Sequence, residues 1–533
     1  MSLYRRLNIA LGWFIFLIAA ITYILTIEPT MSLWDCGEYI TSGYKLEPGH
    51  PPGAPTFMLI ARVFSLFASD VSKVALMVNI MSAIASAFTI LFLFWTITHF
   101  ARRITIGENK DESLGGTIAI MAAGIIGALA YAFSDSFWFS AVEGEVYAMS
   151  SLFTAITFWA ILKWESEANK TYSNRWLIFI AYLVGLSIGV HLLNLLAIPA
   201  VVYIYYFKKF DFSWKGFIMS MVISVVLLAF IMWGLVSGFF TMATRVELML
   251  VNGIGLPYNS GIYFLVILFA AFMFLAIRAS LNNENPVKTA LFSSSAILLS
   301  GVWIISGSLV FNLLVLIAFA FGIYYLAQKK VVFLNLGLSA LLVIMIGFSS
   351  FALIMIRSSA NTPMDENNPE TVFQMLYYLN REQYPKQPLV KGPYYNAQVE
   401  KTEEGKPTYS PIDGKYEITS RANIPIYDDK FVTLFPRMYS SQAAHVSIYK
   451  NWTPVKGKPI QVTTYDGQKK IEYKPTFGEN LKFMFTYQVG YMYLRYFMWN
   501  FSGRQNDIQG TQGEPFHGNW LSGFKVIDEP RVG

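Results

Sequence analysis

Two acidic residues three positions apart follow the first long apolar run of the chain. Asp35 and Glu38 lie in the segment Trp34-Asp35-Cys36-Gly37-Glu38-Tyr39, and residues at this spacing share one face of a helical turn. The sequence Gly49-His50-Pro51-Pro52-Gly53 comes shortly after them, and its prolines stiffen the chain. A lone acid would indicate only a solvated loop. Two acids ahead of a rigid turn indicate a positioned, catalytic carboxylate.

A second acidic pair lies in the segment Glu143-Gly144-Glu145-Val146-Tyr147. Two carboxylates can hold Mg²⁺ or Mn²⁺ and leave most of the octahedral shell to water and phosphate. Contact with a substrate is one alternative. Capping of the following helix by Glu143, where an acid favours the positive end of the helix dipole, is the other.

Two histidines and two arginines are further candidates for substrate binding. His50 lies in the rigid turn, where it contacts a phosphate or sugar or packs the turn. His191 lies between two short apolar runs, where an ionisable group suggests function and packing against Asn194 is the alternative. Arg245 and Arg357 lie at the ends of predicted spans. Each can bind phosphate through a bidentate fork or extend to the membrane interface.

The composition predicts that a membrane positions these residues. Of 533 residues, 54% are hydrophobic and 14% are charged, against roughly 25% charged in an average soluble domain. The net charge of +6 does not indicate nucleic acid, because the basic residues lie in short loops between apolar runs, where they set orientation. Cys36 is the only cysteine, so no internal disulfide is possible.

Eleven apolar runs are long enough to be membrane spans. They cover residues 9–27, 72–98, 116–134, 147–164, 176–190, 192–206, 217–237, 262–277, 290–307, 309–327 and 332–355. The fifth and sixth are short, and one kinked or re-entrant unit is an alternative for them. With eleven spans and the N-terminus inside, every inner loop is basic, as the positive-inside rule expects.

The sequence therefore predicts an all-α polytopic membrane protein with a C-terminal mixed α/β extracytoplasmic domain. The predicted transmembrane domain covers residues 1–356 and includes a catalytic first outer loop at 28–70, which contains an interfacial helix at 54–68. The second domain covers 357–533, with strands within 450–474 and an amphipathic segment near 480–501 that lies on the membrane. A longer parent protein that continues past Gly533 is an alternative that the sequence leaves open.

The motifs resemble the GT-C superfamily of polyprenyl-phosphate-sugar glycosyltransferases. Asp-x-x-Glu-Tyr after the first span, followed by His-Pro-Pro-Gly, is the superfamily's pattern. The chain most resembles the protein O-mannosyltransferase-like branch shared by Bacteroidetes-type bacteria and the animal enzyme of plexin-type receptors. The matching segments are Asp35–Tyr39, His50–Gly53, Glu143–Tyr147, Gly255–Gly261, Arg357–Pro369 and Tyr378–Tyr384.

This resemblance implies an inverting transfer of a sugar, mannose among the candidates, from a polyprenyl-phosphate donor to Ser/Thr of an extracytoplasmic protein. Asp35 would accept the proton of the acceptor hydroxyl, and Glu38 would orient it or bind acceptor. Tyr147 and Arg381 lie in matching segments and are expected to contact substrate. No cofactor is required beyond the possible Mg²⁺ or Mn²⁺. The expected location is the bacterial inner membrane.

Three other functions remain open at this point. A lipid or growing glycan can replace the protein as acceptor without changing the role of Asp35. A transporter or flippase for a lipid-linked substrate would place its ionisable residues at the bilayer midplane and would show interrupted inverted repeats, and the sequence has neither pattern. A membrane scaffold would leave the acidic segments without a purpose.

Overall fold

The chain folds into two compact units. The computed structural model describes residues 2–106, 113–385, 387–463, 469–506, 508 and 517–532. The first unit comprises Met1–Phe133, Phe137–Gln383 and Pro411–Tyr416. The second comprises Ser134–Ser136, Tyr384–Ser410 and Glu417–Gly533.

The first unit is helical over almost all of its length. Within the described residues its α-helices are α1 (Leu3–Leu25), α2 (Cys36–Lys45), α3 (Pro55–Ser65), α4 (Val74–Ile106), α5 (Leu114–Ala132), α6 (Asp135–Ala141), α7 (Val146–Glu167), α8 (Asn174–Ile188), α9 (Ile198–Lys209), α10 (Trp214–Ala229), α11 (Gly238–Glu247), α12 (Ser260–Leu281), α13 (Pro286–Ser300), α14 (Leu309–Lys329), α15 (Val331–Phe348), α16 (Ala352–Ser358) and α17 (Val372–Leu379). Short 3₁₀ or π segments continue several of them, such as η2 (Leu192–Ala197), η3 (Phe230–Ser237) and η4 (Leu248–Asn252).

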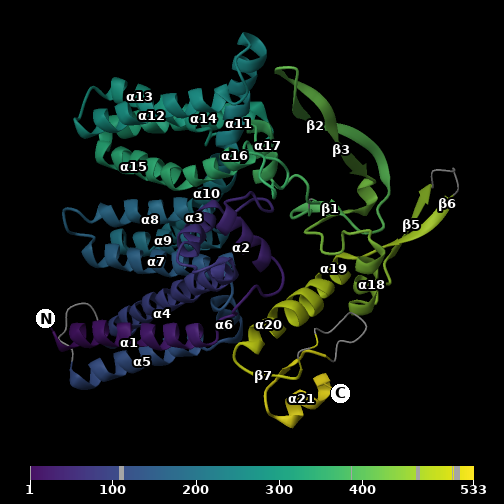
Figure 1. Ribbon diagram of the computed structural model, residues 1–533. Coiled ribbons are helices and arrows are strands. Elements are labelled where there is room, and N and C mark those ends of the chain that lie inside the picture. The colour runs from purple at the N-terminus through teal and green to yellow at the C-terminus, as the bar shows by residue number, and fades with distance from the viewer. Residues whose placement is uncertain are drawn as a thin grey trace. The chain divides into compact units, whose positions relative to one another are not determined.

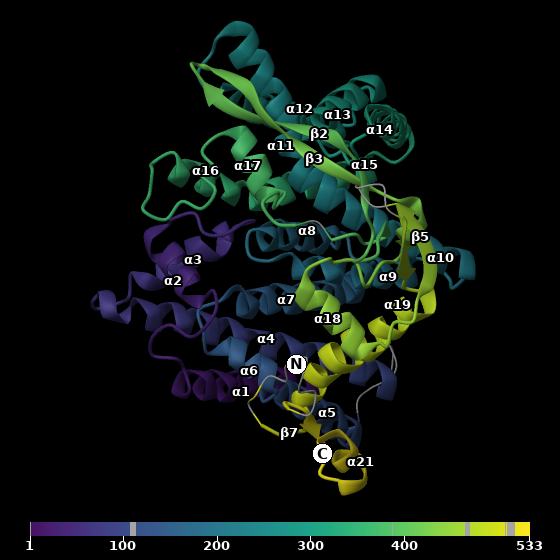
Figure 2. The ribbon, with the colours of Figure 1, turned by 90° about the vertical axis from the view of Figure 1, so that its right-hand side faces the viewer.

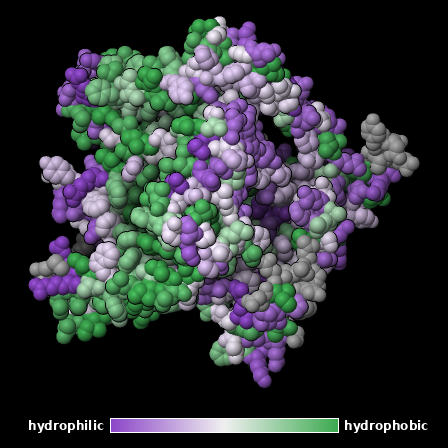
Figure 3. Space-filling model, viewed as in Figure 1, coloured by the Kyte–Doolittle hydropathy of each residue, from purple (hydrophilic) through white to green (hydrophobic). Residues whose placement is uncertain are grey.

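Nine of the described helices are long and apolar enough to cross a membrane. Two of the eleven predicted spans, residues 176–190 and 290–307, correspond instead to α8 and α13, which have 15 residues each. At 1.5 Å per residue, such a helix covers about 22 Å of a hydrocarbon core of about 30 Å. Hydrophobic residues cover the sides of the helices, and hydrophilic residues gather at their ends (Figure 3). The predicted fold class is confirmed, and the helices that are long enough to span number nine rather than eleven.

Helices α1, α4, α7 and α8 lie side by side in Figures 1 and 2, each in contact with the next. Helix α8 also packs closely on α15. A Cβ atom added to Gly185 would lie 2.5 Å from the carbonyl oxygen of Ile344, and one added to Gly347 would lie 2.4 Å from the carbonyl carbon of Gly185. Glycines let the two backbones touch, which is the usual way in which membrane helices associate. This packing supports α8 although it is short.

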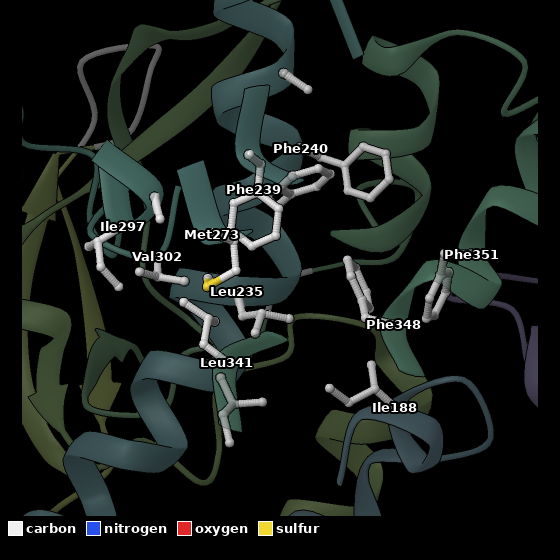
Figure 4. Packing of buried hydrophobic residues seen from close by; sticks show 14 of the residues in the cluster. Ile188, Leu235, Phe239, Phe240, Met273, Ile297, Val302, Leu341, Phe348 and Phe351 are labelled. Carbon is white, nitrogen blue, oxygen red and sulfur yellow. The ribbon is translucent and has the colours of Figure 1, made fainter. Parts of the chain in front are cut away.

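The largest buried cluster joins α8, α11, α12, α13 and α15. Figure 4 shows Phe239, Phe240, Met273, Leu341 and Phe348 among the side chains of this cluster. Burying a large apolar side chain contributes about 1.5–3 kcal/mol in water. In lipid, close packing of the side chains replaces much of that effect.

A buried glutamate, Glu247, binds the N-terminal end of α12 through hydrogen bonds. The carboxylate of Glu247 accepts hydrogen bonds from the backbone N–H groups of Asn259 (2.5 Å) and Gly261 (2.7 Å) and from the hydroxyl of Tyr416 (3.0 Å). Tyr416 belongs to the short segment Pro411–Tyr416, which forms the tip of a β-hairpin and is the part of that hairpin included in this unit. The first turn of a helix favours a negative charge, so Glu247 holds both the helix and the hairpin tip.

The second unit is mixed α/β. Its described strands form four two-stranded sheets: β1 (Lys391–Pro393) with β4 (Val432–Leu434), β2 (Val399–Ile412) with β3 (Lys415–Tyr427), β5 (Lys458–Thr463) with β6 (Lys469–Lys474), and β7 (Gly503–Arg504) with β8 (Trp520–Leu521). Its described α-helices are α18 (Ala443–Trp452), α19 (Phe477–Phe483), α20 (Arg495–Trp499) and α21 (Lys525–Val532). The π-helical segment η7 (Met484–Leu494) links α19 to α20. The amphipathic segment predicted near 480–501 is thus helical, and its location on a membrane stays a prediction.

The boundary between the two units falls later in the sequence than the predicted boundary at residue 357. The break lies between Gln383 and Tyr384. Residues 357–383 join the helical unit because α17 packs on α11 and because side chains of this stretch bond to the loop after α2.

Candidate functional site

Helix α2 presents Asp35 and Glu38 differently. Asp35 is the N-cap of α2 and is exposed, and its side chain makes no capping hydrogen bond. Glu38 is half-buried one turn later and accepts hydrogen bonds from His50 through the backbone N–H (2.6 Å) and the ring Nδ1 (2.9 Å). The two predicted catalytic acids therefore have different surroundings: Asp35 faces solvent, and Glu38 is engaged by the turn.

The contact between Glu38 and His50 is an ion pair that shifts both groups toward their charged forms. Burial raises the pKa of the Glu38 carboxyl, but the hydrogen bonds from His50 outweigh burial and hold it below its usual value. The hydrogen bond to Glu38 raises the pKa of His50 against the opposing effect of burial, and the charge of Asp35 adds to the increase. The other ring nitrogen of His50 lies 3.5 Å from the hydroxyl of Tyr39.

A tyrosine far along the chain holds the turn that carries His50. The hydroxyl of Tyr378, on α17, donates to the carbonyl oxygen of Gly49 at 2.5 Å. Gly53 has a φ of +74°, and a Cβ atom there would lie 2.7 Å from the Tyr378 hydroxyl. Glycine is therefore required at position 53 for both conformation and space. Tyr378 lies in one of the family-like segments, but the sequence assigned it no role.

Glu143 and Glu145 lie beside the start of α2. Glu143 is buried and accepts a hydrogen bond from the hydroxyl of Ser32 at 2.6 Å. Burial raises the pKa of Glu143, and burial together with the charges of Glu143 and Asp35 raises the pKa of Glu145 to about 7. The N-cap of α7 is Glu145, and its side chain makes no capping bond. This geometry gives no support to helix capping by Glu143.

The ligand atoms of Cys36, Glu143 and Glu145 lie within 4.8 Å of one another. Burial raises the pKa of the Cys36 thiol to about 12, and its soft sulfur suits Mg²⁺ or Mn²⁺ less well than oxygen donors do. Two carboxylates are hard oxygen donors, which suit Mg²⁺ or Mn²⁺. A cation would also relieve the repulsion that raises the pKa of Glu145. The residues present therefore fit the predicted metal, which stays a prediction.

His191 and Tyr147 extend the site toward α17. His191 is the N-cap of η2, and its Nδ1 accepts from the backbone N–H of Leu193 at 3.2 Å. Its ring lies 5.5 Å from the ring of Tyr147, measured between centroids. Burial lowers the pKa of His191, and the positive charge of Arg381 lowers it further. Arg381 is exposed, so it offers a cation within electrostatic range of His191.

Within the described residues, no hydrogen bond or ion pair joins Arg245 or Arg357 to the acidic residues of the site. Arg357 donates from Nε to the carbonyl oxygen of Leu46 (2.8 Å) and from Nη2 to that of Lys45 (3.3 Å), so it caps the C-terminal end of α2. Arg245 is exposed on α11 over the ring of Trp303, with 5.9 Å to the centroid. The proposed binding of phosphate by these two arginines has less support than binding by Arg381.

We expect the substitution Glu38→Gln to lower the pKa of His50, because a neutral amide removes the charge that favours the imidazolium. NMR titration of labelled histidines measures this directly. The pair stabilises the folded state below the unfolded histidine value of about 6.5, and that stabilisation is lost as the pH rises through the elevated folded value. The signals of the other histidines are the control. An unchanged His50 midpoint in the variant would show that the ion pair does not form.

The comparisons with known proteins cover the part of the chain that carries these residues. Residues 35–214 match a family model described as the Protein O-mannosyl-transferase TMEM260 N-terminal domain. This segment begins at Asp35 and contains the two acidic pairs, His50, Tyr147 and His191. The chain is similar to protein O-mannosyl-transferases. The resemblance that the motifs indicated is thereby confirmed.

Two curated protein O-mannosyl-transferases illustrate the extent of the similarity. The protein named Protein O-mannosyl-transferase tmem260 of Dictyostelium discoideum is 25% identical over 231 residues, which is 40% of this chain and 26% of that protein. Protein O-mannosyl-transferase TMEM260 of Mus musculus is 26% identical over 175 residues, which is 33% of this chain and 22% of that protein. The aligned part thus spans about a quarter of these O-mannosyl-transferases.

The C-terminal unit has a separate match. Residues 385–485 match a family of unknown function (DUF8416), which begins next to the boundary between the compact units at Gln383. No solved structure matches the chain.

Proposed function

We propose that this protein transfers mannose from a polyprenyl-phosphate carrier to Ser or Thr of an extracytoplasmic protein, with inversion at the anomeric carbon. The observation that carries the proposal is the exposed carboxylate of Asp35, which no capping bond occupies, at the start of the segment similar to protein O-mannosyl-transferases. The activity of those relatives, as their names state it, supports protein O-mannosylation.

The chemistry requires one base at the reacting hydroxyl. The Asp35 carboxylate accepts the proton of the acceptor hydroxyl while that oxygen forms its bond to the anomeric carbon. The bond from that carbon to the lipid phosphate breaks, and the phosphate leaves with the electron pair. A phosphate is a stable anion, so it needs positive charge rather than a proton. Glu38 holds His50 and the turn beside Asp35 and does not itself touch the reacting atoms.

We assign the positive charge for the leaving phosphate to Arg381. Arg381 and His191 lie within electrostatic range of each other, and Tyr147 packs on His191. Guanidinium binds phosphate through two parallel hydrogen bonds. Glu143 and Glu145 would hold a divalent ion, which would supply further charge stabilisation to the phosphate when bound.

The acceptor is tested with the purified protein and a polyprenyl-phosphate-mannose donor. A Ser/Thr-rich peptide, the same peptide with Ala at these positions, and a lipid acceptor are supplied in parallel. Mannose on the Ser/Thr peptide alone supports the proposal, and NMR of the product gives the anomeric configuration. Mannose on the lipid alone would assign the protein to the alternative acceptor class. Transfer to neither acceptor would contradict the proposed function.

We expect the N-terminus to be cytoplasmic and the second unit to be extracytoplasmic, in the inner membrane of a bacterium. Topology reporters fused at Lys209, Lys330 and Gly392 test this orientation, because the basic loops predict that the first two lie inside. The fusions at Lys209 and Lys330 act as internal controls for the third. A cytoplasmic signal at Gly392 would contradict the assignment.

A further inference from the structure

A cavity of about 690 Å³ lies at the other end of the helices that carry the candidate site. Asp35 follows the C-terminal end of α1, whereas Arg5 of the cavity lies in the first turn of α1. Glu145 precedes α7, whereas Lys163 of the cavity lies near the end of α7. Arg5 lies 20 residues before the end of α1 and Lys163 lies 18 residues after Glu145, so about 30 Å of helix separates the cavity from the end that carries the candidate site.

Basic side chains from four helices converge on this cavity. Its lining includes Arg5, Arg102, Arg103, Lys163 and Lys208, which come from α1, α4, α7 and α9. Among the described residues, Glu165 pairs with Arg103 at 2.8 Å and contacts His99 at 3.2 Å, and Glu167 lies within electrostatic range of Lys163. Arg5 and Lys163 lie within electrostatic range of each other, and positive charges gathered around a concave space focus the field and attract anions.

The walls are built for an amphipathic ligand rather than a small ion alone. Trp95 and Trp159 line the cavity with ring centroids 6.1 Å apart, and tryptophan is typical of the depth at which lipid headgroups lie. Asn8 lines the same cavity, and in the described part of the chain its buried Oδ1 has no hydrogen-bond partner. A buried amide oxygen without a partner is costly, and a hydroxyl of a bound headgroup would satisfy it.

We propose that this cavity binds the phosphate-bearing headgroup of an anionic membrane lipid. The phosphate lies among the basic side chains, a headgroup hydroxyl donates to Asn8, and the acyl chains leave along the apolar sides of α1 and α7. Basic pockets between transmembrane helices are suited to such headgroups. The site is separate from Asp35 and does not depend on the proposed transfer reaction.

Native mass spectrometry of the purified full chain tests the proposal with phosphatidylglycerol, phosphatidylcholine and inorganic phosphate as probes. The test variant is Arg5→Gln with Lys163→Gln. The matched control is Lys170→Gln with Lys288→Gln, which removes the same charge from exposed lysines that pair with Glu167 and Glu284 and do not line the cavity. Thermal unfolding of each protein shows that it is folded, and Lys163→Gln alone replaces the double variant if that fails to fold.

The wild-type chain should bind one phosphatidylglycerol more tightly than phosphatidylcholine. The test variant should bind phosphatidylglycerol about 30-fold more weakly, because each basic residue near a membrane surface contributes about one kcal/mol, while the control should match the wild type. Equal binding by the test and control variants, or equal binding of both lipids, would overturn the proposal. Displacement of phosphatidylglycerol by millimolar inorganic phosphate would reject the lipid as the source and assign the cavity to a soluble phosphate compound.

Discussion

The substitution Asp35→Asn should lower the rate of sugar transfer by about 10²–10⁴-fold, the usual effect of removing a positioned general base. The amide keeps the size of the side chain and loses the proton acceptor. Folding should be unaffected, because Asp35 is exposed and its side chain makes no capping bond in α2. Binding of the polyprenyl-phosphate donor should also change little, since the carboxylate does not contact the phosphate in the proposed mechanism.

The assay compares purified wild type, Asp35→Asn and Asp211→Asn, with donor binding measured in parallel. Asp211 is an exposed aspartate in the loop between α9 and α10, so its substitution reproduces the chemical change away from the site. Loss of turnover in Asp35→Asn alone, with normal donor affinity, supports the role of base. Near-normal turnover would remove Asp35 from the chemistry and leave Glu38 as the candidate.

Removal of divalent cations should lower the transfer rate by about 10²–10³-fold, and Mg²⁺ or Mn²⁺ should restore it. A bound cation stabilises developing phosphate charge by several kcal/mol, and about 1.4 kcal/mol corresponds to a tenfold change in rate. The affinity for the cation should rise with pH through about 7, because burial and the charges of Glu143 and Asp35 raise the pKa of Glu145 to about 7. Below that pH, the proton competes with the metal for the carboxylate.

Two variants separate the metal from other roles of this pair. Glu145→Gln removes one carboxylate and should weaken the response to Mg²⁺ and Mn²⁺. Cys36→Ser should leave it unchanged, because the buried thiol, whose pKa is raised to about 12, is not expected to be a ligand. Full activity of the wild type in excess chelator would leave both glutamates as substrate contacts.

The sequence alone determined the membrane class and the local part of the site. Lipid imposes long apolar helices, and such runs are visible without knowledge of the fold. Asp35, Glu38 and His50 lie within 16 residues of one another, so local helix geometry and a stiff turn were enough to group them. The number of spans does not follow from the apolar runs alone, since α8 and α13 have only 15 residues each and α8 relies on close packing between Gly185 and Gly347 of α15.

The tertiary structure decided which distant residues join that group. Tyr378 holds Gly49 from 329 positions away, and Arg357, expected to bind phosphate, reaches Leu46 from 311 positions away and caps α2. Spacing along the chain carries no signal for such contacts. The pKa of Glu145 likewise depends on burial and on charges from α2 and from Glu143. The effect of burial depends on the exclusion of water, and the effect of the charges depends on their distance in three dimensions. Only the folded chain defines these two quantities.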